Sequence, residues 1–202
     1  MPSPPERFRS AIERFDNANS EDPHRVTVDG REQPASVSSA RRMSDWLNRL
    51  VPDASEALRL AVRCHHLCRW QFPRAGYPLT RAGYHLWRTA AARFHAERAG
   101  EILRDVGYDV ATIARVQALV RKEGLKTDAE TQALEDAACL VFLESGFAEF
   151  AERHDEPKII GILHRTWRKM SPQGQAAALG LQLPPGARGL IERALAGDAK
   201  RA

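Results

Sequence analysis

Two adjacent histidines, His65 and His66, stand near the end of an apolar stretch and are followed by Arg69 and Trp70. A buried imidazole needs a hydrogen-bond partner once water is removed, so these residues suit a plain hydrophobic core poorly. Histidine also titrates close to neutral pH and can transfer protons. We therefore expect polar groups from other parts of the chain to face this stretch.

Two later helical stretches carry polar side chains that could face the histidines. The first contains Arg88 and His95, which are seven residues apart and therefore share one helix face. The second is apolar on most sides but contains Glu135 and Asp136, and a carboxylate in such a helix needs a cationic or donor partner. These features predict a polar, cationic pocket enclosed by the middle helices.

The arginines near this pocket are a stronger signal as a group than singly. Arginine suits bidentate recognition of phosphate or carboxylate groups, although any one of them is better explained as a surface charge or an ion-pair partner. Together they predict an anionic ligand. The residues expected to bind it are Arg42, Arg69, Arg74, Tyr77, Arg81, Arg88 and Lys122.

The elements that must position these residues are predicted from apolar spacing and from turn residues. A minor hairpin or extended loop is expected at 25–31, because Val-Thr-Val alternates there and Asp29-Gly30 is a turn dipeptide. Helices are expected to begin at Ser3, Ser38, Asp53, Arg81, Asp109, Thr127 or Asp128, Asp155 and Ser171, with a last one after Pro184. The count of eight or nine helices predicts an all-α fold.

Length and composition favour one compact domain spanning all 202 residues. Hydrophobic residues make up 43% and charged residues 28%, with a formal net charge of +4, which is ordinary for a soluble globular protein. No apolar run approaches a membrane span, and the first residues lack the apolar core of a signal peptide. We expect a cytoplasmic protein that does not bind membranes.

The three cysteines do not predict a disulfide framework, since their number is odd and no Cys-x-x-Cys pair occurs. Cys64, His65 and Cys68 lie within five residues, but a structural zinc site needs a second pair of ligands downstream. We therefore expect the cysteines to be small core residues. His65 is expected on the surface, and a buried His66 bonded to Asp136 or to a backbone carbonyl is as compatible with the sequence as a functional one.

The order of four segments resembles the HD-domain superfamily of helical metal-dependent phosphohydrolases over about residues 38–145. The segments are the helix ending at the histidines, then 94–103, 113–120 and 131–142. The resemblance implies a divalent metal, manganese, iron, nickel or zinc, that activates water on a phosphate ester. His66 matches the histidine of the His-Asp pair, Asp136 the distal aspartate, and His95 an additional histidine of some members. Leu67 replaces the aspartate of the pair, so the ligand set is incomplete.

This resemblance implies catalytic roles for three residues. His66 and Asp136 would act as an acid-base or metal-binding pair, and His95 as a second ligand or a proton donor. The implied activity is a hydrolase acting on a phosphate ester or a nucleotide-type substrate.

The whole chain also resembles, more closely, the uncharacterised family called domain of unknown function family 4202. The segments that carry this similarity are Phe15-Asp16 with Asn19 and Asp22-Pro23, Arg42-Met43, His66 with Arg69-Trp70, Pro73-Arg74 with Tyr77-Pro78, Arg81 to Tyr84, Trp87 to Thr89, the His95 helix, Leu134 to Asp136, and Lys169 to Ser171.

Two other classes of function remain open. The protein could be a non-catalytic module that binds a nucleotide, an RNA backbone or an acidic partner, or a scaffold whose polar helix faces form a subunit interface. The sequence has no helix-turn-helix signature, no aromatic-glycine RNA motif and no phosphate-binding glycine loop. Metal binding would favour the hydrolase, and salt-sensitive RNA binding would favour the binding module.

Overall fold

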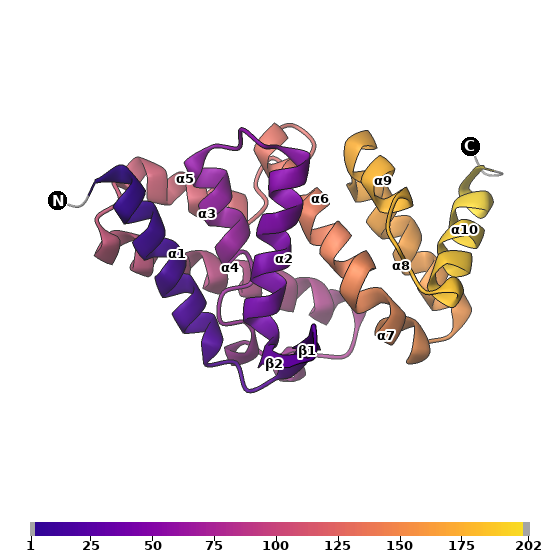
Figure 1. Ribbon diagram of the computed structural model, residues 1–202. Helices are drawn as coiled ribbons and strands as arrows, with labels where there is room; N and C mark the ends of the chain where they lie inside the picture. Colours follow the sequence, from indigo (N-terminus) through magenta and orange to yellow (C-terminus); the bar gives the residue numbers. More distant parts are fainter. Residues whose placement is uncertain (1–2, 200–202) are drawn as a thin grey trace. The chain divides into compact units, whose positions relative to one another are not determined.

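The computed structural model describes residues 3–199, with side chains for residues 3–195 (Figure 1). The described residues form ten α-helices and one two-stranded hairpin, which confirms the all-α fold class. Among them, no helix is both long enough and apolar enough to cross a membrane. The chain divides by its internal contacts into two compact units, the first ending at Leu134 and the second beginning at Glu135.

In the first unit the elements are α1 (Pro4–Ser20), β1 (Arg25–Val28), β2 (Arg31–Pro34), α2 (Ala35–Leu50), α3 (Glu56–Cys64), α4 (Arg81–Val106) and α5 (Val110–Val120). Two short 3-10 turns, η1 (Arg69–Gln71) and η2 (Arg74–Gly76), lie between α3 and α4. Helix α6 (Ala129–Val141) begins in this unit and continues into the second.

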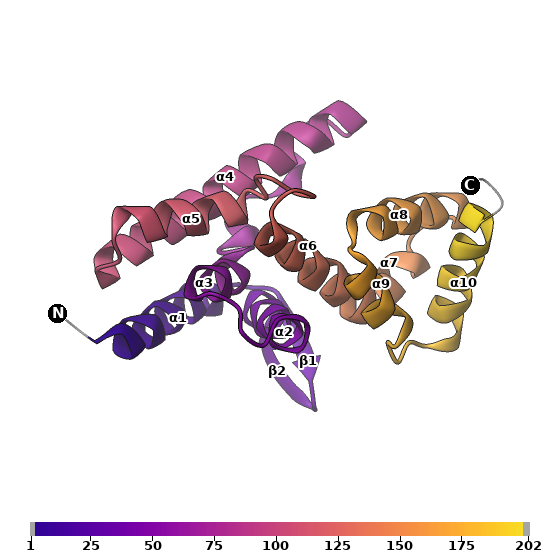
Figure 2. The ribbon, with the colours of Figure 1, turned by 90° about the horizontal axis from the view of Figure 1, so that it is seen from above.

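Helix α3 forms the centre of the first unit. It packs against α1, α2 and α5, and Figure 2 shows it between α1 and α2. Its residues Leu60, Ala61 and Val62 are fully buried, as expected for a helix that is covered on several sides. The Oγ of Ser55, not Asp53 as expected, caps this helix by accepting a hydrogen bond from the N–H of Leu58.

Hydrogen bonds join the segment before the hairpin to the start of α2. Asp29 and Gly30 both have positive φ, +50° and +74°, as a two-residue turn of the mirror-image type requires. Helix α2 begins at Ala35, three residues before the expected Ser38. Its first N–H groups have partners, because Ala35 donates to the carbonyl of His24 and Ser36 donates to the carboxylate of Asp22.

Helix α4 has the predicted bounds. Thr80 caps its start by accepting from the N–H of Gly83, and Gly107 ends it at φ +90°. A Cβ at position 83 would lie 2.2 Å from the carbonyl oxygen of Pro78, so only glycine allows the preceding loop to approach the helix this closely.

In the second unit, α6 runs into a π-helical turn, η3 (Phe142–Gly146), and then into α7 (Phe147–Glu152), α8 (Glu156–Lys169), α9 (Pro172–Leu179) and α10 (Pro185–Ala199). The π-helical turn separates α7 from α6, whereas the sequence predicted one helix through Phe147. This division raises the helix count from the expected eight or nine to ten within the described residues.

Candidate functional site

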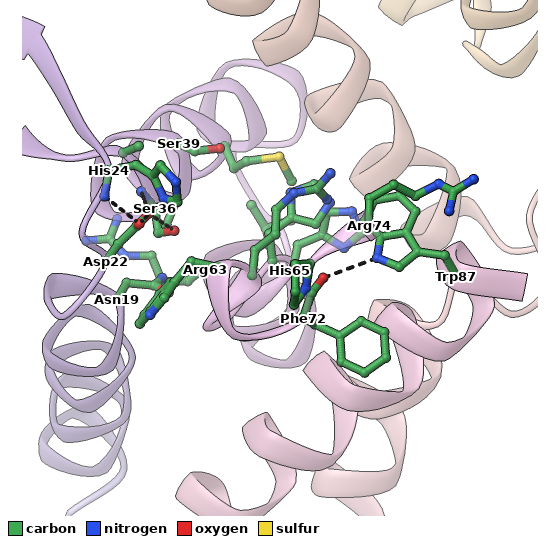
Figure 3. Close-up of a pocket in the computed structure, with 18 residues that line it drawn as sticks. Asn19, Asp22, His24, Ser36, Ser39, Arg63, His65, Phe72, Arg74 and Trp87 are labelled. Carbon is green, nitrogen blue, oxygen red and sulfur yellow. Dashed lines mark hydrogen bonds and ion pairs between the residues drawn. The ribbon is translucent and has the colours of Figure 1, made fainter. Parts of the chain in front are cut away.

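A cavity of about 490 Å³ lies entirely within the first unit (Figure 3). Its walls come from the end of α1 and the turn after it, the first half of α2, the end of α3, the loop after α3, and α4. The lining residues are Asn19, Asp22, His24, Ala35, Ser36, Ser39, Ala40, Met43, Val62, Arg63, His65, His66, Arg69, Trp70, Phe72, Pro73, Arg74 and Trp87.

The turn that ends α3 fixes the two histidines on the cavity wall. The helix stops at Cys64, and Cys68 adopts a left-handed conformation with φ +55°, which is uncommon for a residue with a side chain. The N–H of Cys68 donates to the Oδ1 of Asn19 at 3.1 Å, and this long-range bond holds the turn against α1. His65 and His66 are therefore presented by a constrained turn rather than by the helix itself.

The loop from Arg69 to Thr80 is fastened to α4. The indole N–H of Trp87 donates to the carbonyl of Phe72 at 3.1 Å. The guanidinium of Arg74 donates to the carbonyls of Tyr77 and Pro78, which closes the loop on itself. These bonds organise this wall of the cavity before any ligand binds.

The arginines on the cavity wall differ in how their charge is balanced. Arg63 donates two hydrogen bonds to the carboxylate of Asp16, at 2.8 Å and 2.6 Å, and this pair is neutral. The guanidinium of Arg69 lies 5.2 Å from the ring centre of Trp87. Within the described part of the chain, neither Arg69 nor Arg74 forms an ion pair with a carboxylate.

Asp22 is the one carboxylate among the lining residues, all of which the structure describes. It is 3% exposed and accepts hydrogen bonds from the N–H and Oγ of Ser36, from the N–H of His24 and from the Nδ1 of His24. Burial alone would raise the pKa of this carboxyl, but the hydrogen bonds from Ser36 and His24 outweigh burial and lower it. Asp22 is therefore an ionised group with its acceptors in use.

His65 is buried, at 5% exposure, so the expectation that it lies on the surface is wrong. The turn after α3 points it inward, because the helix ends one residue earlier and the helical spacing no longer applies. Neither of its ring nitrogens has a hydrogen-bond partner among the described residues. Burial, helped by the positive charge of Lys122, holds the pKa of His65 well below its usual value, so the ring is neutral.

His66 lies between the other two histidines. Its ring centre is 4.2 Å from that of His65 and 5.8 Å from that of His95. Burial and the nearby Arg69 keep the pKa of His66 well below its usual value as well. His66 lines the cavity, whereas His95 lies behind it.

His95 is 2% exposed, and its Nδ1 lies 2.7 Å from the carbonyl oxygen of Leu67. Because a carbonyl only accepts, Nδ1 carries the proton, and the neutral ring keeps a lone pair on Nε2. This Nε2 has no partner among the described residues. Burial lowers the pKa of His95 to about 4, although the bond to Leu67 opposes this effect.

Asp136 belongs to the second unit. Its carboxylate accepts hydrogen bonds from the N–H and Oγ of Ser171, the residue that caps α9. A Cβ at Gly174 would lie 2.7 Å from this carboxylate, so α9 packs directly onto it. The neighbouring Glu135 is 2% exposed and forms an ion pair with Lys169 at 3.6 Å. These contacts tie α9 and the end of α8 to α6.

The residues that the structure describes contain no group of three His, Cys, Asp or Glu side chains that could hold a metal ion. Asp136, one of the three residues that the HD-domain resemblance assigns to a metal, accepts hydrogen bonds from Ser171. The metal site therefore stays a prediction from the HD-domain resemblance, and no chemical step is assigned to it.

The cavity brings together three of the predicted residues, His66, Arg69 and Arg74. The other predicted ligand-binding residues, Arg42, Tyr77, Arg81, Arg88 and Lys122, are not part of its lining. The residues that the prediction missed include Asn19, Asp22, Ser39 and His65. Asn19 stands in the last turn of α1 and Asp22 in the turn after it, and their signal was a cluster of short polar residues between two apolar elements.

Cys64, Cys68 and Cys139 are all buried and free, as expected for small core residues. Cys64 and Cys68 lie at the two ends of the turn that carries the histidines.

The comparison with protein families gives one result for this chain. The family described as "Domain of unknown function (DUF4202)" matches residues 9–191, so nearly the whole of both units is included. No curated protein and no solved structure matches the chain. Because the match covers far more than half of its length, the chain belongs to this family.

Proposed function

We propose that this member of the DUF4202 family binds a small anionic molecule, a phosphate ester, in the cavity of the first unit. The observation that carries the proposal is Arg69, whose guanidinium lines the cavity over Trp87 without a carboxylate partner among the described residues. An arginine whose donors are not used by a carboxylate is suited to a phosphate group.

The surroundings of Arg69 support an anion over a cation. Arg74 adds a second positive charge that backbone carbonyls orient but do not neutralise. The carboxylate of Asp22 is already engaged by Ser36 and His24, so it offers little to a cationic ligand. The neutral His65 and His66 can donate an N–H without adding charge.

The proposal is tested by thermal unfolding with inorganic phosphate, methyl phosphate and a short RNA, followed by calorimetric titration of any compound that raises Tm. We expect the phosphate compounds to raise Tm, and to raise it further as the ratio of ligand concentration to Kd increases, because they bind the folded state. Arg69→Gln should weaken binding about 10- to 100-fold, because one charge-assisted contact is worth roughly 1.5–3 kcal/mol.

Arg93→Gln is the matched control, since Arg93 is exposed on α4 and lies outside the cavity lining. Unchanged binding in Arg69→Gln, or an equal loss in Arg93→Gln, would contradict the proposal. Tight, salt-sensitive RNA binding without any response to the small phosphates would support the nucleic-acid alternative instead.

A second candidate function is hydrolysis of the bound ester, as the HD-domain resemblance implies. The observation that favours it is the contact between His66 on the cavity wall and His95, whose Nε2 keeps a free lone pair. A neutral imidazole can accept a proton from an attacking water.

Release of inorganic phosphate from p-nitrophenyl phosphate and from adenosine monophosphate tests this candidate, with and without added manganese, nickel or zinc. Turnover that His66→Gln abolishes while leaving binding intact would support hydrolysis. Binding without turnover under all these conditions would contradict hydrolysis and support a non-catalytic binding module.

A further inference from the structure

Three polar side chains on the cavity wall have hydrogen-bonding groups that the fold does not use. They are the amide of Asn19, the hydroxyl of Ser39 and the imidazole of His65. They come from α1, α2 and the turn after α3, so three separate elements bring them to one cavity.

The amide of Asn19 is almost completely buried, at 1% exposure. Its bonded atom must be the oxygen, because the N–H of Cys68 can only donate. The NH₂ group therefore keeps two donors, and neither has a partner within the described residues.

His65 and Ser39 supply both kinds of hydrogen-bonding group. A neutral imidazole offers one donor and one acceptor, and neither ring nitrogen of His65 is used. The hydroxyl of Ser39 can also donate and accept, and it has no partner in the part of the chain that the structure describes. Together with the Asn19 amide, these groups carry donors and acceptors but no net charge.

A neutral set of donors and acceptors matches hydroxyl groups better than a second anion. A buried polar group without a partner costs about 1–3 kcal/mol, so a ligand that supplies the partners gains affinity. In Figure 3, His65 is drawn between the side of the cavity with Asn19 and Ser39 and the side with Arg74 and Trp87. A ligand that spans the cavity would meet positive charge on one side and neutral hydrogen-bonding groups on the other.

We propose that Asn19, Ser39 and His65 form a subsite for the hydroxyl-bearing part of a phosphate ester whose phosphate lies at Arg69 and Arg74. This inference rests on the proposed function and narrows the ligand class to sugar phosphates and nucleotides. These two sources share a phosphorylated, hydroxyl-bearing group, and Trp70 on the same wall could in addition stack on a base.

The test is calorimetric titration of the full chain with methyl phosphate, ribose 5-phosphate and adenosine monophosphate. In the wild type, ribose 5-phosphate should bind at least about tenfold more tightly than methyl phosphate, because hydroxyl groups meet the unused donors and acceptors. Ser39→Ala should remove several-fold of this advantage and leave methyl phosphate binding unchanged. His65→Gln, which keeps a polar side chain, should reduce it as well.

Ser44→Ala is the matched control on the same helix, because Ser44 does not line the cavity and its Oγ already has partners: it donates to the carbonyl of Ala40 and accepts from Arg63, which Asp16 continues to hold. Equal affinity of the wild type for methyl phosphate and ribose 5-phosphate would overturn the subsite while leaving the proposed function intact. An advantage of ribose 5-phosphate that survives in both Ser39→Ala and His65→Gln would overturn it too.

Failure of every phosphate compound to bind would contradict the proposed function itself, together with the subsite that rests on it. Tighter binding of adenosine monophosphate than of ribose 5-phosphate would identify a nucleotide, and the reverse order would identify a sugar phosphate; either order supports the subsite.

Discussion

Asp22 and His65 are two buried polar residues that line the same cavity, and they differ in their hydrogen bonds. Asp22, Ser36 and His24 bond to one another and to the start of α2, so their polar atoms stabilise the fold. His65 is buried as Asp22 is, yet both of its ring nitrogens are without a partner among the described residues. Burial is therefore the same for these two residues, and the state of their hydrogen bonds is what distinguishes them.

The same contrast separates the arginines. Arg63 donates two hydrogen bonds to the carboxylate of Asp16, which neutralises its charge. Arg69 lies over the ring of Trp87 and has no carboxylate partner among the described residues. We therefore expect substitutions of Asp22 or Arg63 to lower the stability of the fold, and substitutions of His65 or Arg69 to weaken ligand binding.

The largest expected effect on stability is that of Asp22→Ala. This change leaves the N–H groups of Ser36 and His24 without their acceptor, so the free energy of unfolding should fall by about 2–4 kcal/mol. Urea unfolding at pH 7 measures it. Asp45→Ala, an exposed aspartate on α2, serves as the control and should change stability by less than about 0.5 kcal/mol. A similarly small change in Asp22→Ala would contradict the structural role.

A somewhat smaller change in the free energy of unfolding is expected when the pH is lowered, because of His95. Its pKa is about 4 in the folded state and about 6.5 in the unfolded chain, so between these values the unfolded chain binds more protons. The contribution of neutral His95 to the free energy of unfolding should therefore be nearly fully present above pH 6.5. It should decrease by about 2 kcal/mol as the pH falls from 7 to 5.

Urea unfolding of the wild type and of His95→Asn at both pH values measures this contribution. Asparagine keeps a donor for the carbonyl of Leu67 but does not titrate, so the variant should lose a part of the pH dependence. An identical pH dependence in the two proteins would show that the ring of His95 is not held neutral by burial.

The smallest expected effect has the opposite sign. His65→Leu removes two unpaired nitrogens from a buried position, so it should stabilise the protein without ligand by about 1 kcal/mol. His85→Leu, on the exposed face of α4, is the control and should leave stability nearly unchanged. Destabilisation by His65→Leu would indicate that the imidazole has a structural role, which would remove the contrast with Asp22.

The sequence predicted local structure well wherever a short stretch determines it. The bounds of α4 follow from Thr80 and Gly107, and the hairpin follows from Asp29 and Gly30. The separate α7 was missed, because the π-helical turn before it does not interrupt the apolar pattern. The cap of α3 was assigned to Asp53 rather than Ser55, since both are followed by residues that suit a helix start.

The candidate site was predicted less completely, because its geometry depends on long-range contacts. The orientation of His65 follows from the left-handed Cys68 and from its bond to Asn19, which is 49 residues away in the chain. Helical spacing alone placed this histidine on the surface. Ser171, which follows Asp136 by 35 residues, donates to its carboxylate, and no local pattern around Asp136 predicted this contact.

We propose that a bound phosphate ester supplies the hydrogen-bond partners that the ring nitrogens of His65 lack among the described residues. The most direct measurement is a nitrogen-15 spectrum of the histidine rings during titration with ribose 5-phosphate, with His65 assigned from the spectrum of His65→Gln. We expect a saturable change at His65 that Arg69→Gln shifts to higher ligand concentration. Saturable binding that leaves both nitrogens of His65 unchanged would contradict it.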